Sequence, residues 1–215
     1  MNLFLDSADI NEIEYFKEFI DGVTTNPSSI SKSWHDTKYE DLIHAICTII
    51  KGPVSVEVIA NTHDDMLKEA LHLTSIAKNV VIKLPLTHEG LVTCKKLWQG
   101  YQIPVNMTLC FSLSQAILAA KAGATFISPF IGRLDDISCD GMNFIQDICR
   151  IYSNYRFNTQ VLVSSVRSVL HFTTVAKIGA HAITLPVQIL KQILKIHPLT
   201  EHGITIFQLD WETRR

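Results

Sequence analysis

Short runs of apolar and β-branched residues recur at fairly regular intervals along this chain. They occupy residues 2–5, 22–25, 54–59, 79–84, 103–109, 125–130, 160–165 and 182–186. Segments with helical spacing lie between them, for example at 9–20, where Asp9 and Glu12 resemble a capping pair. The pattern therefore predicts eight consecutive strand–helix units.

Eight such units favour a closed (β/α)8 barrel, the TIM barrel of the α/β class. Strands in such a barrel are buried on both sides, which explains why the runs are continuously apolar. The alternative is a doubly wound open sheet, but it usually has a glycine-rich loop after its first strand, and "DSADIN" contains no glycine. No linker divides the sequence, so we expect a single barrel domain over 1–215 with an extra C-terminal helix at about 200–215.

Polar residues are concentrated where the predicted strands end, which is where (β/α)8 barrels carry their catalytic side chains. Residues two positions apart on a strand share a face, so Ser55 with Glu57, and Asn106 with Thr108, are expected to point inward together. The full set of polar residues at or near the strand ends is Asp6, Thr24, Thr25, Asn26, Glu57, Lys83, Asn106, Thr108, Ser128, Ser165 and Arg167.

Lys83 is the unusual member of this set, because it interrupts the apolar run "NVVIKLPLT". A buried ammonium group is unfavourable unless it is paired or loses its proton. A neutral lysine amine can attack a carbonyl group and form a Schiff base, and Asp6 and Glu57 are then candidates for proton transfer. Thr108 can position a water between them. These residues indicate a class I aldolase or a transaldolase.

Two arginines and a serine extend the chemistry to phosphorylated sugars. Arg133, Ser165 and Arg167 follow late strands of the predicted barrel, where such barrels commonly bind phosphate. Each candidate also has a purely structural interpretation: Asp6 as a helix cap, or Glu57 as no more than the ion-pair partner of Lys83. The common position at strand ends favours a site over these interpretations.

Composition narrows the possible partners and location. The net charge is −2 and the basic residues are scattered, which argues against nucleic acid or an anionic membrane as a partner. No apolar stretch reaches the ~18 residues of a membrane span, and the five cysteines form no C-x-x-C pair, as expected of reduced thiols in the cytoplasm. No histidine is expected at a catalytic strand end beside a partner ligand, so we expect no metal site.

Several motifs occur in order along the whole chain: "LDSAD", "GVTTNPS", "VSVEV", "VVIKLPLT", "NMTL", "ISPFIGRLDD" and "SSVR". Together they resemble the small, single-domain branch of the transaldolase family, which also contains fructose-6-phosphate aldolases. The resemblance implies transfer of dihydroxyacetone between sugar phosphates of the pentose phosphate pathway, without metal or organic cofactor. It implies a Schiff base on Lys83, proton transfer by Asp6, Glu57 and Thr108, donor binding by Thr25, Asn26, Asn106 and Ser128, and phosphate binding by Arg133, Ser165 and Arg167.

Two positions bear on the branch of the family. The aldolases resemble this sequence but carry Gln where this chain has Glu57 and Tyr where it has Phe130. The carboxylate of Glu57, and the absence of a tyrosine hydroxyl at Phe130, favour a transaldolase over an aldolase that releases free dihydroxyacetone. A non-catalytic sugar-phosphate binding barrel is the alternative from another class. The resemblance also implies a homo-oligomer, a pentamer or decamer, with the C-terminal helix passed to a neighbouring subunit.

Overall fold

Eight strands form the centre of the computed structural model, which describes residues 1–33 and 38–214. Each apolar run identified in the sequence overlaps one of them, with β1, β4 and β5 ending one residue beyond their runs, so the prediction of eight strands is confirmed. They are β1 (Asn2–Asp6), β2 (Gly22–Thr24), β3 (Val54–Glu57), β4 (Val80–Pro85), β5 (Val105–Cys110), β6 (Phe126–Pro129), β7 (Gln160–Val163) and β8 (Ala182–Leu185).

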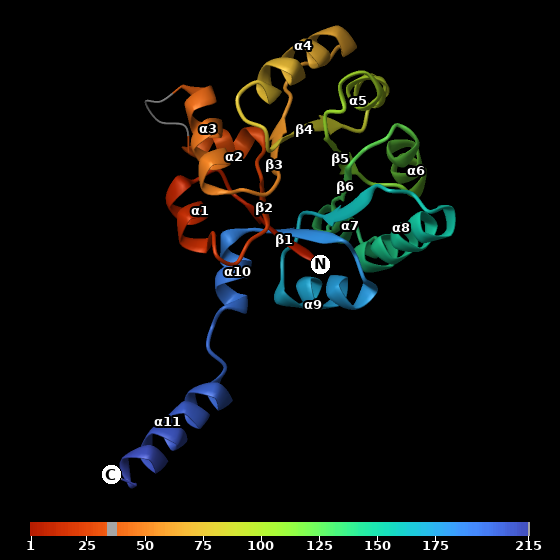
Figure 1. Cartoon of the computed structure of the whole chain (residues 1–215). Helices are drawn as coiled ribbons and strands as arrows, with labels where there is room; N and C mark the ends of the chain where they lie inside the picture. Colours follow the sequence, from red (N-terminus) through yellow and green to blue (C-terminus); the bar gives the residue numbers. More distant parts are fainter. Residues whose placement is uncertain (34–37, 215) are drawn as a thin grey trace.

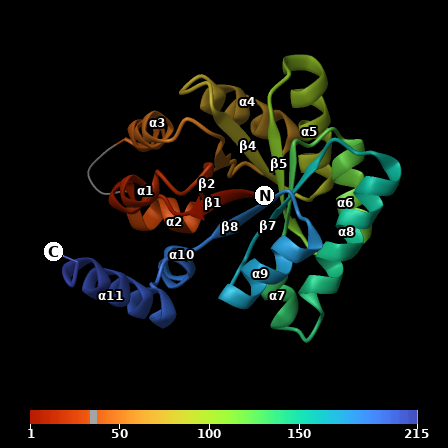
Figure 2. The same ribbon diagram turned by 60° about the horizontal axis from the view of Figure 1, so that its bottom comes forward.

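The strands close into a barrel in sequence order. All neighbours pair in parallel, and β1 pairs with both β2 and β8, so no strand of the barrel is left at an edge. Figure 2 shows the strands at the centre with helices around them. The TIM-barrel prediction is therefore confirmed, and the open doubly wound sheet is excluded.

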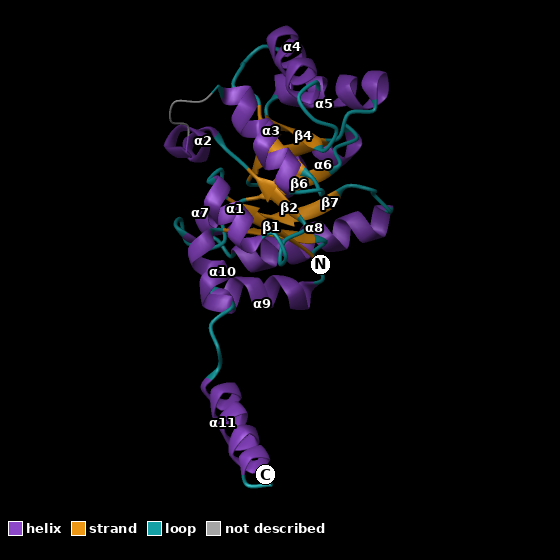
Figure 3. Ribbon diagram, turned by 60° about the vertical axis from the view of Figure 1, so that its left-hand side comes forward, coloured by secondary structure: helices purple, strands orange, loops and turns teal. Residues whose placement is uncertain are grey.

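Helices follow the strands, and all except the last of them cover the barrel from outside (Figures 1 and 3). Among the described residues, none of these helices combines the length and the apolar character needed to cross a bilayer. They are α1 (Ile10–Phe16), α2 (Pro27–Ser33), α3 (Tyr39–Ile49), α4 (His63–Thr74), α5 (His88–Tyr101), α6 (Leu113–Lys121), α7 (Ile131–Asp135), α8 (Gly141–Tyr155), α9 (Val169–Ile178), α10 (Val187–Ile193) and α11 (Pro198–Glu212).

The last helix, α11, lies away from the barrel at the end of an extended connection (Figures 1 and 3). The extra C-terminal helix is confirmed, and it begins with Pro198 because proline needs no hydrogen-bond acceptor in the first helical turn. Arg215, the last residue of the predicted helix, lies outside the described residues. None of the residues of α11 is buried, so this chain alone provides no packing for the helix.

A layer of apolar side chains closes the barrel interior below the carboxyl ends of the strands. We call this layer the floor cluster; it consists of Phe4, Val81, Phe126, Leu162 and Ala182, all buried. Side chains alternate along a strand, so the residue two positions later also points inward, one layer higher. Those next residues are all polar: Asp6, Lys83, Ser128, Ser164 and Thr184.

The intervening strand residues face outward and form the main hydrophobic core with the helices. Leu5, Ile82 and Ile127 are fully buried there. Burial of a side chain of this size stabilises the fold by about 1.5–3 kcal/mol. The same alternation that fixes the outer core therefore aims the polar residues at the barrel axis.

Candidate active site

A cavity of about 410 Å³ lies at the carboxyl ends of the strands, above the floor cluster. Of the residues predicted for the site, all line this cavity except Thr25, Asn106 and Arg167. The lining consists of Asp6, Thr24, Asn26, Pro27, Ser28, Glu57, Lys83, Thr108, Leu109, Ser128, Phe130, Arg133, Ser164, Ser165 and Thr184.

Lys83 projects into this cavity and is only 6% exposed. The strand register pairs Lys83 on β4 with Glu57 on β3, and the lysine amine donates a hydrogen bond of 2.7 Å to a carboxylate oxygen of Glu57. A second bond of 3.0 Å goes to the main-chain carbonyl of Thr25. The amine is therefore paired rather than surrounded by apolar groups alone, and a base that can take its proton lies beside it.

Thr25 contributes to the site through its main chain and not through its side chain. Its hydroxyl donates to the carbonyl of Ser55 at 2.9 Å and is directed away from the cavity. Its own carbonyl accepts the bond from Lys83. The residue thus orients the lysine, whereas the resemblance implied a contact with the substrate.

Asp6, at the end of β1, has a pKa raised above its ordinary value because burial disfavours the charged carboxylate. The positive charge of Lys83 and long hydrogen bonds of 3.4 Å from Thr24 and Asn26 oppose this shift without cancelling it. Asp6 does not cap the helix that follows it. Asp9 is the cap of α1, since its carboxylate accepts from the N–H groups of two residues in the first turn.

The capping pair predicted for α1 is only half correct. Asp9 caps the helix as expected, but the Glu12 carboxylate accepts a hydrogen bond of 2.5 Å from the hydroxyl of Ser7 instead of reaching the Asp9 main chain. The main-chain N–H of Asp9 donates to the Ser7 hydroxyl oxygen at 3.1 Å. Ser7 therefore takes the place that Glu12 was predicted to fill, and Asp6 is left free for the cavity.

Asp6→Asn is expected to raise stability at neutral pH while lowering kcat for any reaction that uses this acid by about 10²–10⁴-fold. A raised folded-state pKa means that the wild type loses stability as pH rises from near 3.8 through that pKa, and asparagine removes this loss. The stability advantage of Asp6→Asn should therefore grow between about pH 4 and pH 7, as measured by urea unfolding.

Asp9→Asn provides the matched control for that experiment. Asparagine caps helices as well as aspartate does, and Asp9 lies outside the cavity. We expect this variant to follow the wild type at every pH. A constant or shrinking advantage of Asp6→Asn with rising pH would contradict the assigned direction of the pKa shift.

Thr108 lines the cavity with a hydroxyl group that is available for hydrogen bonding. Its Oγ1 is buried and has no hydrogen-bond partner among the described residues. Leaving a buried hydroxyl unsatisfied costs about 1–3 kcal/mol, so a water or a substrate hydroxyl bound in the cavity would be favoured at this position. This geometry agrees with the predicted role of Thr108 in positioning a water.

A β-bulge follows Thr108 and explains why the next residue also faces the cavity. Leu109 has a φ of 59°, and the register of β5 against β6 shifts between Met107 and Cys110. A bulge interrupts the alternation of side chains, so two consecutive residues can line the same space. Sequence reasoning, which assumed regular alternation, missed Leu109 for this reason.

Asn106 supports the site from behind. It is fully buried, donates to the hydroxyl of Ser55 at 3.2 Å and accepts from the hydroxyl of Ser128 at 2.8 Å. Ser128 lines the cavity and Asn106 does not. Asn106 therefore fixes the orientation of the Ser128 hydroxyl, while direct contact with a bound molecule is left to Ser128.

Arg133 and Phe130 form a part of the cavity wall that combines a charged group with an aromatic surface. The guanidinium of Arg133 lies 5.3 Å from the centre of the Phe130 ring, a cation–π arrangement. Phe130 also contacts the ring of Phe111 edge-on, with 5.8 Å between the ring centres. This wall presents a positive group to the cavity and keeps the surface around it apolar.

Ser165 and Arg133 both line the cavity, and two main-chain hydrogen bonds join their segments. The N–H groups of Ile131 and Gly132 donate to the carbonyls of Ser164 and Ser165 at 3.1 and 3.0 Å. Ser165 has a φ of 61°, which reverses the chain direction after β7. The predicted phosphate-binding residues Arg133 and Ser165 are thus brought together, because these bonds join the start of α7 to the loop after β7.

Arg167 is the predicted phosphate ligand that does not reach the cavity. Its guanidinium forms two hydrogen bonds with the carboxylate of Asp136, one of 2.6 Å from Nη2 to Oδ2 and one from Nη1 to Oδ1. Both side chains are half exposed, at 49% and 51%. In the structure, Arg167 is therefore paired with a protein carboxylate.

Two small polar residues of the cavity escaped the sequence analysis, Ser164 and Thr184, whereas Thr24 was among the polar residues expected at the strand ends. The hydroxyls of Thr24 and Thr184 lie 2.7 Å apart across β1 and form a hydrogen bond. The signal that could have found Ser164 and Thr184 is their position two residues after Leu162 and Ala182 of the floor cluster. Serine and threonine are common within apolar runs. This signal can therefore be used only when the strand register is already known.

No group of three or more His, Cys, Asp or Glu side chains in the described part of the chain is arranged to hold a metal ion. The acids at the cavity, Asp6 and Glu57, lie beside the amine of Lys83, which gives each carboxylate a positive neighbour. The arrangement thus suits proton transfer around a reactive amine.

Several known proteins are similar to this chain in sequence. The sequence pattern of the family described as transaldolase/fructose-6-phosphate aldolase matches residues 3–213. A probable transaldolase of Paracoccus denitrificans is 52% identical over 98% of this chain and 96% of its own length. A probable transaldolase of Sphingopyxis alaskensis is 53% identical over 98% of this chain and 97% of its own.

Solved structures with little sequence similarity share the fold. Orotidine 5'-monophosphate decarboxylase from Methanocaldococcus jannaschii, complexed with the inhibitor BMP, superposes with a TM-score of 0.64 at 13% identity. The match covers 86% of this chain and 88% of that protein. At this level of identity the likeness concerns the barrel alone.

Proposed function

The chain belongs to the transaldolase/fructose-6-phosphate aldolase family, and from this premise we propose that it is a transaldolase. It transfers a dihydroxyacetone unit from a ketose phosphate, fructose 6-phosphate or sedoheptulose 7-phosphate, to an aldose phosphate. The observation that carries the proposal is the buried amine of Lys83, which faces the cavity 2.7 Å from the carboxylate of Glu57. The corresponding pathway and location are the pentose phosphate pathway and the cytoplasm.

The reaction begins when Lys83 loses a proton to Glu57 and its amine adds to the ketose carbonyl. Loss of water from the resulting carbinolamine gives an iminium ion, with Glu57 as the proton carrier and Thr108 holding the water. Asp6 then takes the proton of the C4 hydroxyl, the C3–C4 bond breaks, and the aldose phosphate leaves. The enamine that remains on Lys83 attacks the aldehyde of the acceptor, and the same steps run in reverse.

The raised pKa of Asp6 suits this assignment. A general acid–base works best when its pKa lies near the working pH, and burial moves the pKa of Asp6 in that direction. The proximity of Lys83 limits the shift, so Asp6 can both accept the hydroxyl proton and return it. Arg133 and Ser165 serve the phosphate group of the substrate at the opposite wall.

Comparing two rates on fructose 6-phosphate tests the proposal. Transfer to erythrose 4-phosphate, giving sedoheptulose 7-phosphate, should far exceed the release of free dihydroxyacetone. The apolar ring of Phe130 and the acid Glu57 both line the cavity and favour retention of the enamine until an acceptor arrives. A dominant release rate would move the chain to the aldolase branch of the family.

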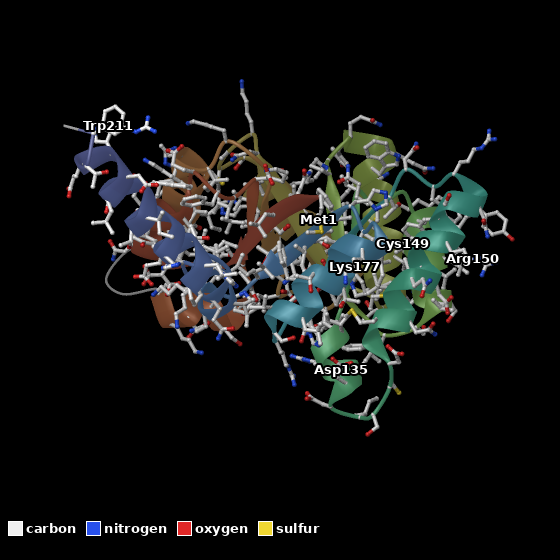
Figure 4. The ribbon with its side chains drawn as sticks, turned by 90° about the horizontal axis from the view of Figure 1, so that it is seen from below. Met1, Asp135, Cys149, Arg150, Lys177 and Trp211 are labelled. Atoms are coloured by element: carbon white, nitrogen blue, oxygen red, sulfur yellow. The ribbon has the colours of Figure 1, made fainter. Side chains whose placement is uncertain are left out.

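We also propose that the protein is a homo-oligomer in which α11 packs on a neighbouring copy, a pentamer or decamer as the resemblance implies. The helix has no buried residue, and it exposes Phe207 by 74% and Trp211 by 67%. Figure 4 shows Trp211 standing off α11 at the edge of the molecule. Large aromatic side chains of this kind are enriched in the buried centres of subunit interfaces.

Removing residues 198–215 is expected to lower the oligomeric state without unfolding the barrel. The reason is that α11 makes no buried contact with its own barrel, so its loss exposes no core residue. Light scattering of the full and shortened chains gives the masses, and circular dichroism reports the fold. An unchanged mass in the shortened protein would show that α11 is not the assembly element.

A further inference from the structure

We propose that Asp136 competes with the phosphate group of a bound sugar phosphate for the guanidinium of Arg167, and so sets how tightly phosphorylated substrates bind. The inference rests on the proposed function in one respect, the phosphate subsite at Arg133 and Ser165. Asp136 itself lies outside the cavity and has no role in the reaction steps described above.

The position of Arg167 places its side chain within reach of that subsite. It follows Ser165 by two residues, and its stem crosses the first turn of α7 at Gly132. A Cβ added at Gly132 would lie 2.6 Å from Nε of Arg167 and 2.3 Å from the carbonyl oxygen of Ser165. The residue after Gly132 is Arg133, so the stem of Arg167 lies against the chain segment that carries this cavity-lining arginine.

The pair with Asp136 uses the part of Arg167 that a phosphate would need. Both terminal nitrogens, Nη1 and Nη2, donate to the two oxygens of the carboxylate. This fork-to-fork geometry is the one that arginine also uses for phosphate, so the same edge cannot serve both anions at once. Hydrogen bonding to Arg167 holds the pKa of Asp136 below its ordinary value, so the competing carboxylate stays charged at neutral pH.

The exchange needs only a side-chain movement. The main-chain N–H of Arg167 donates to Nδ1 of His171 at 3.3 Å, and Nε2 of the same ring lies 3.3 Å from the carboxylate of Asp135 on α7. These contacts hold the backbone of the loop against α7. The Arg167–Asp136 pair is half exposed, and exposed ion pairs are weak enough for a dianionic phosphate to displace.

Asp136→Asn provides the test, with inorganic phosphate as the probe. Asparagine keeps the size of the side chain but removes the competing charge, so we expect the Kd for phosphate, measured by titration calorimetry, to fall about twofold to fivefold. Glu14→Gln is the matched control, because it removes the charge of an exposed carboxylate on α1 that is paired with Lys17. This control should leave the Kd unchanged. An unchanged or increased Kd in Asp136→Asn would overturn the inference, since an increase would mean that Asp136 supports Arg167 for phosphate binding.

A double variant separates the exchange from a general charge effect. In an Arg167→Ala background, Asp136→Asn should give little or no gain in phosphate affinity, because no guanidinium remains to be released. A gain as large as in the single variant would overturn the inference. In turnover assays, Asp136→Asn should lower KM for fructose 6-phosphate by a similar factor, leave kcat nearly unchanged, and leave KM for unphosphorylated fructose unaltered.

Failure of the proposed function would look different from failure of this inference. Calorimetry does not depend on turnover, so phosphate binding is measured even if the protein transfers no dihydroxyacetone. Absence of phosphate binding in the wild type would remove the subsite and the inference with it. Phosphate binding in the wild type with no tightening in Asp136→Asn would remove the inference alone.

Discussion

Lys83→Met is expected to lower kcat for dihydroxyacetone transfer by at least about 10³-fold, because no other lysine lines the cavity in the described part of the chain. Methionine matches the length of the lysine stem and cannot attack a carbonyl. Borohydride added with fructose 6-phosphate should fix a covalent adduct on Lys83 of the wild type, since it reduces the iminium bond to a stable amine. Peptide mass spectrometry locates this adduct.

The control for this experiment is Lys17→Met, which removes an exposed lysine directly after α1 and should keep both activity and adduct. Circular dichroism checks the fold of Lys83→Met, since the variant leaves the carboxylate of Glu57 without its amine partner. The adduct also decides against the alternative function. A barrel that only binds sugar phosphates, with Lys83 serving as an ion-pair partner, would give no adduct in the wild type.

Glu57→Gln is expected to lower kcat by about 10²-fold or more, because an amide can accept the hydrogen bond from Lys83 but cannot carry its proton. The comparison with Glu57→Asp makes the result specific. Aspartate keeps the acid and shortens the side chain, whereas glutamine keeps the length and removes the acid. If Glu57 is a proton carrier, Glu57→Asp should retain more activity than Glu57→Gln, in assays of transfer from fructose 6-phosphate to erythrose 4-phosphate.

The reverse order would assign Glu57 a different role. Glutamine being the better replacement would mean that length and hydrogen bonding matter and that the charge does not, as expected for a residue that merely orients the lysine. Urea unfolding of both variants keeps the comparison independent of stability.

The barrel could be predicted from the sequence because its strands are buried on both faces and are therefore continuous apolar runs. The location of the site followed from the same runs, since the polar residues that end them, such as Asp6, Glu57 and Lys83, converge in a closed parallel barrel. Both predictions depend only on positions along the chain. Strand spacing and the period of two were sufficient for them.

The direction of long side chains and the packing of isolated elements could not be predicted in this way. Nothing local distinguishes Arg133, which lines the cavity, from Arg167, which pairs with Asp136 through a contact across 31 residues. Whether Asp6 or Asp9 caps α1 depends on where the helix starts. The two positions differ by only three residues, and the apolar spacing does not fix the start that closely. The position of α11 depends on what covers it, and apolar spacing alone does not specify that surface.

The floor cluster has a consequence for the order of events in catalysis. The rings of Phe4 and Phe126 meet edge-on with 5.8 Å between their centres, and with three further buried side chains they seal the barrel below the cavity. Molecules must therefore enter and leave past the same loops at the carboxyl ends of the strands. In a dihydroxyacetone transfer, the first aldose phosphate has to depart before the second can approach the enamine. The shape of the barrel would thus enforce a ping-pong sequence. The three-carbon unit would stay bound to the protein after the first aldose phosphate leaves and until the acceptor binds.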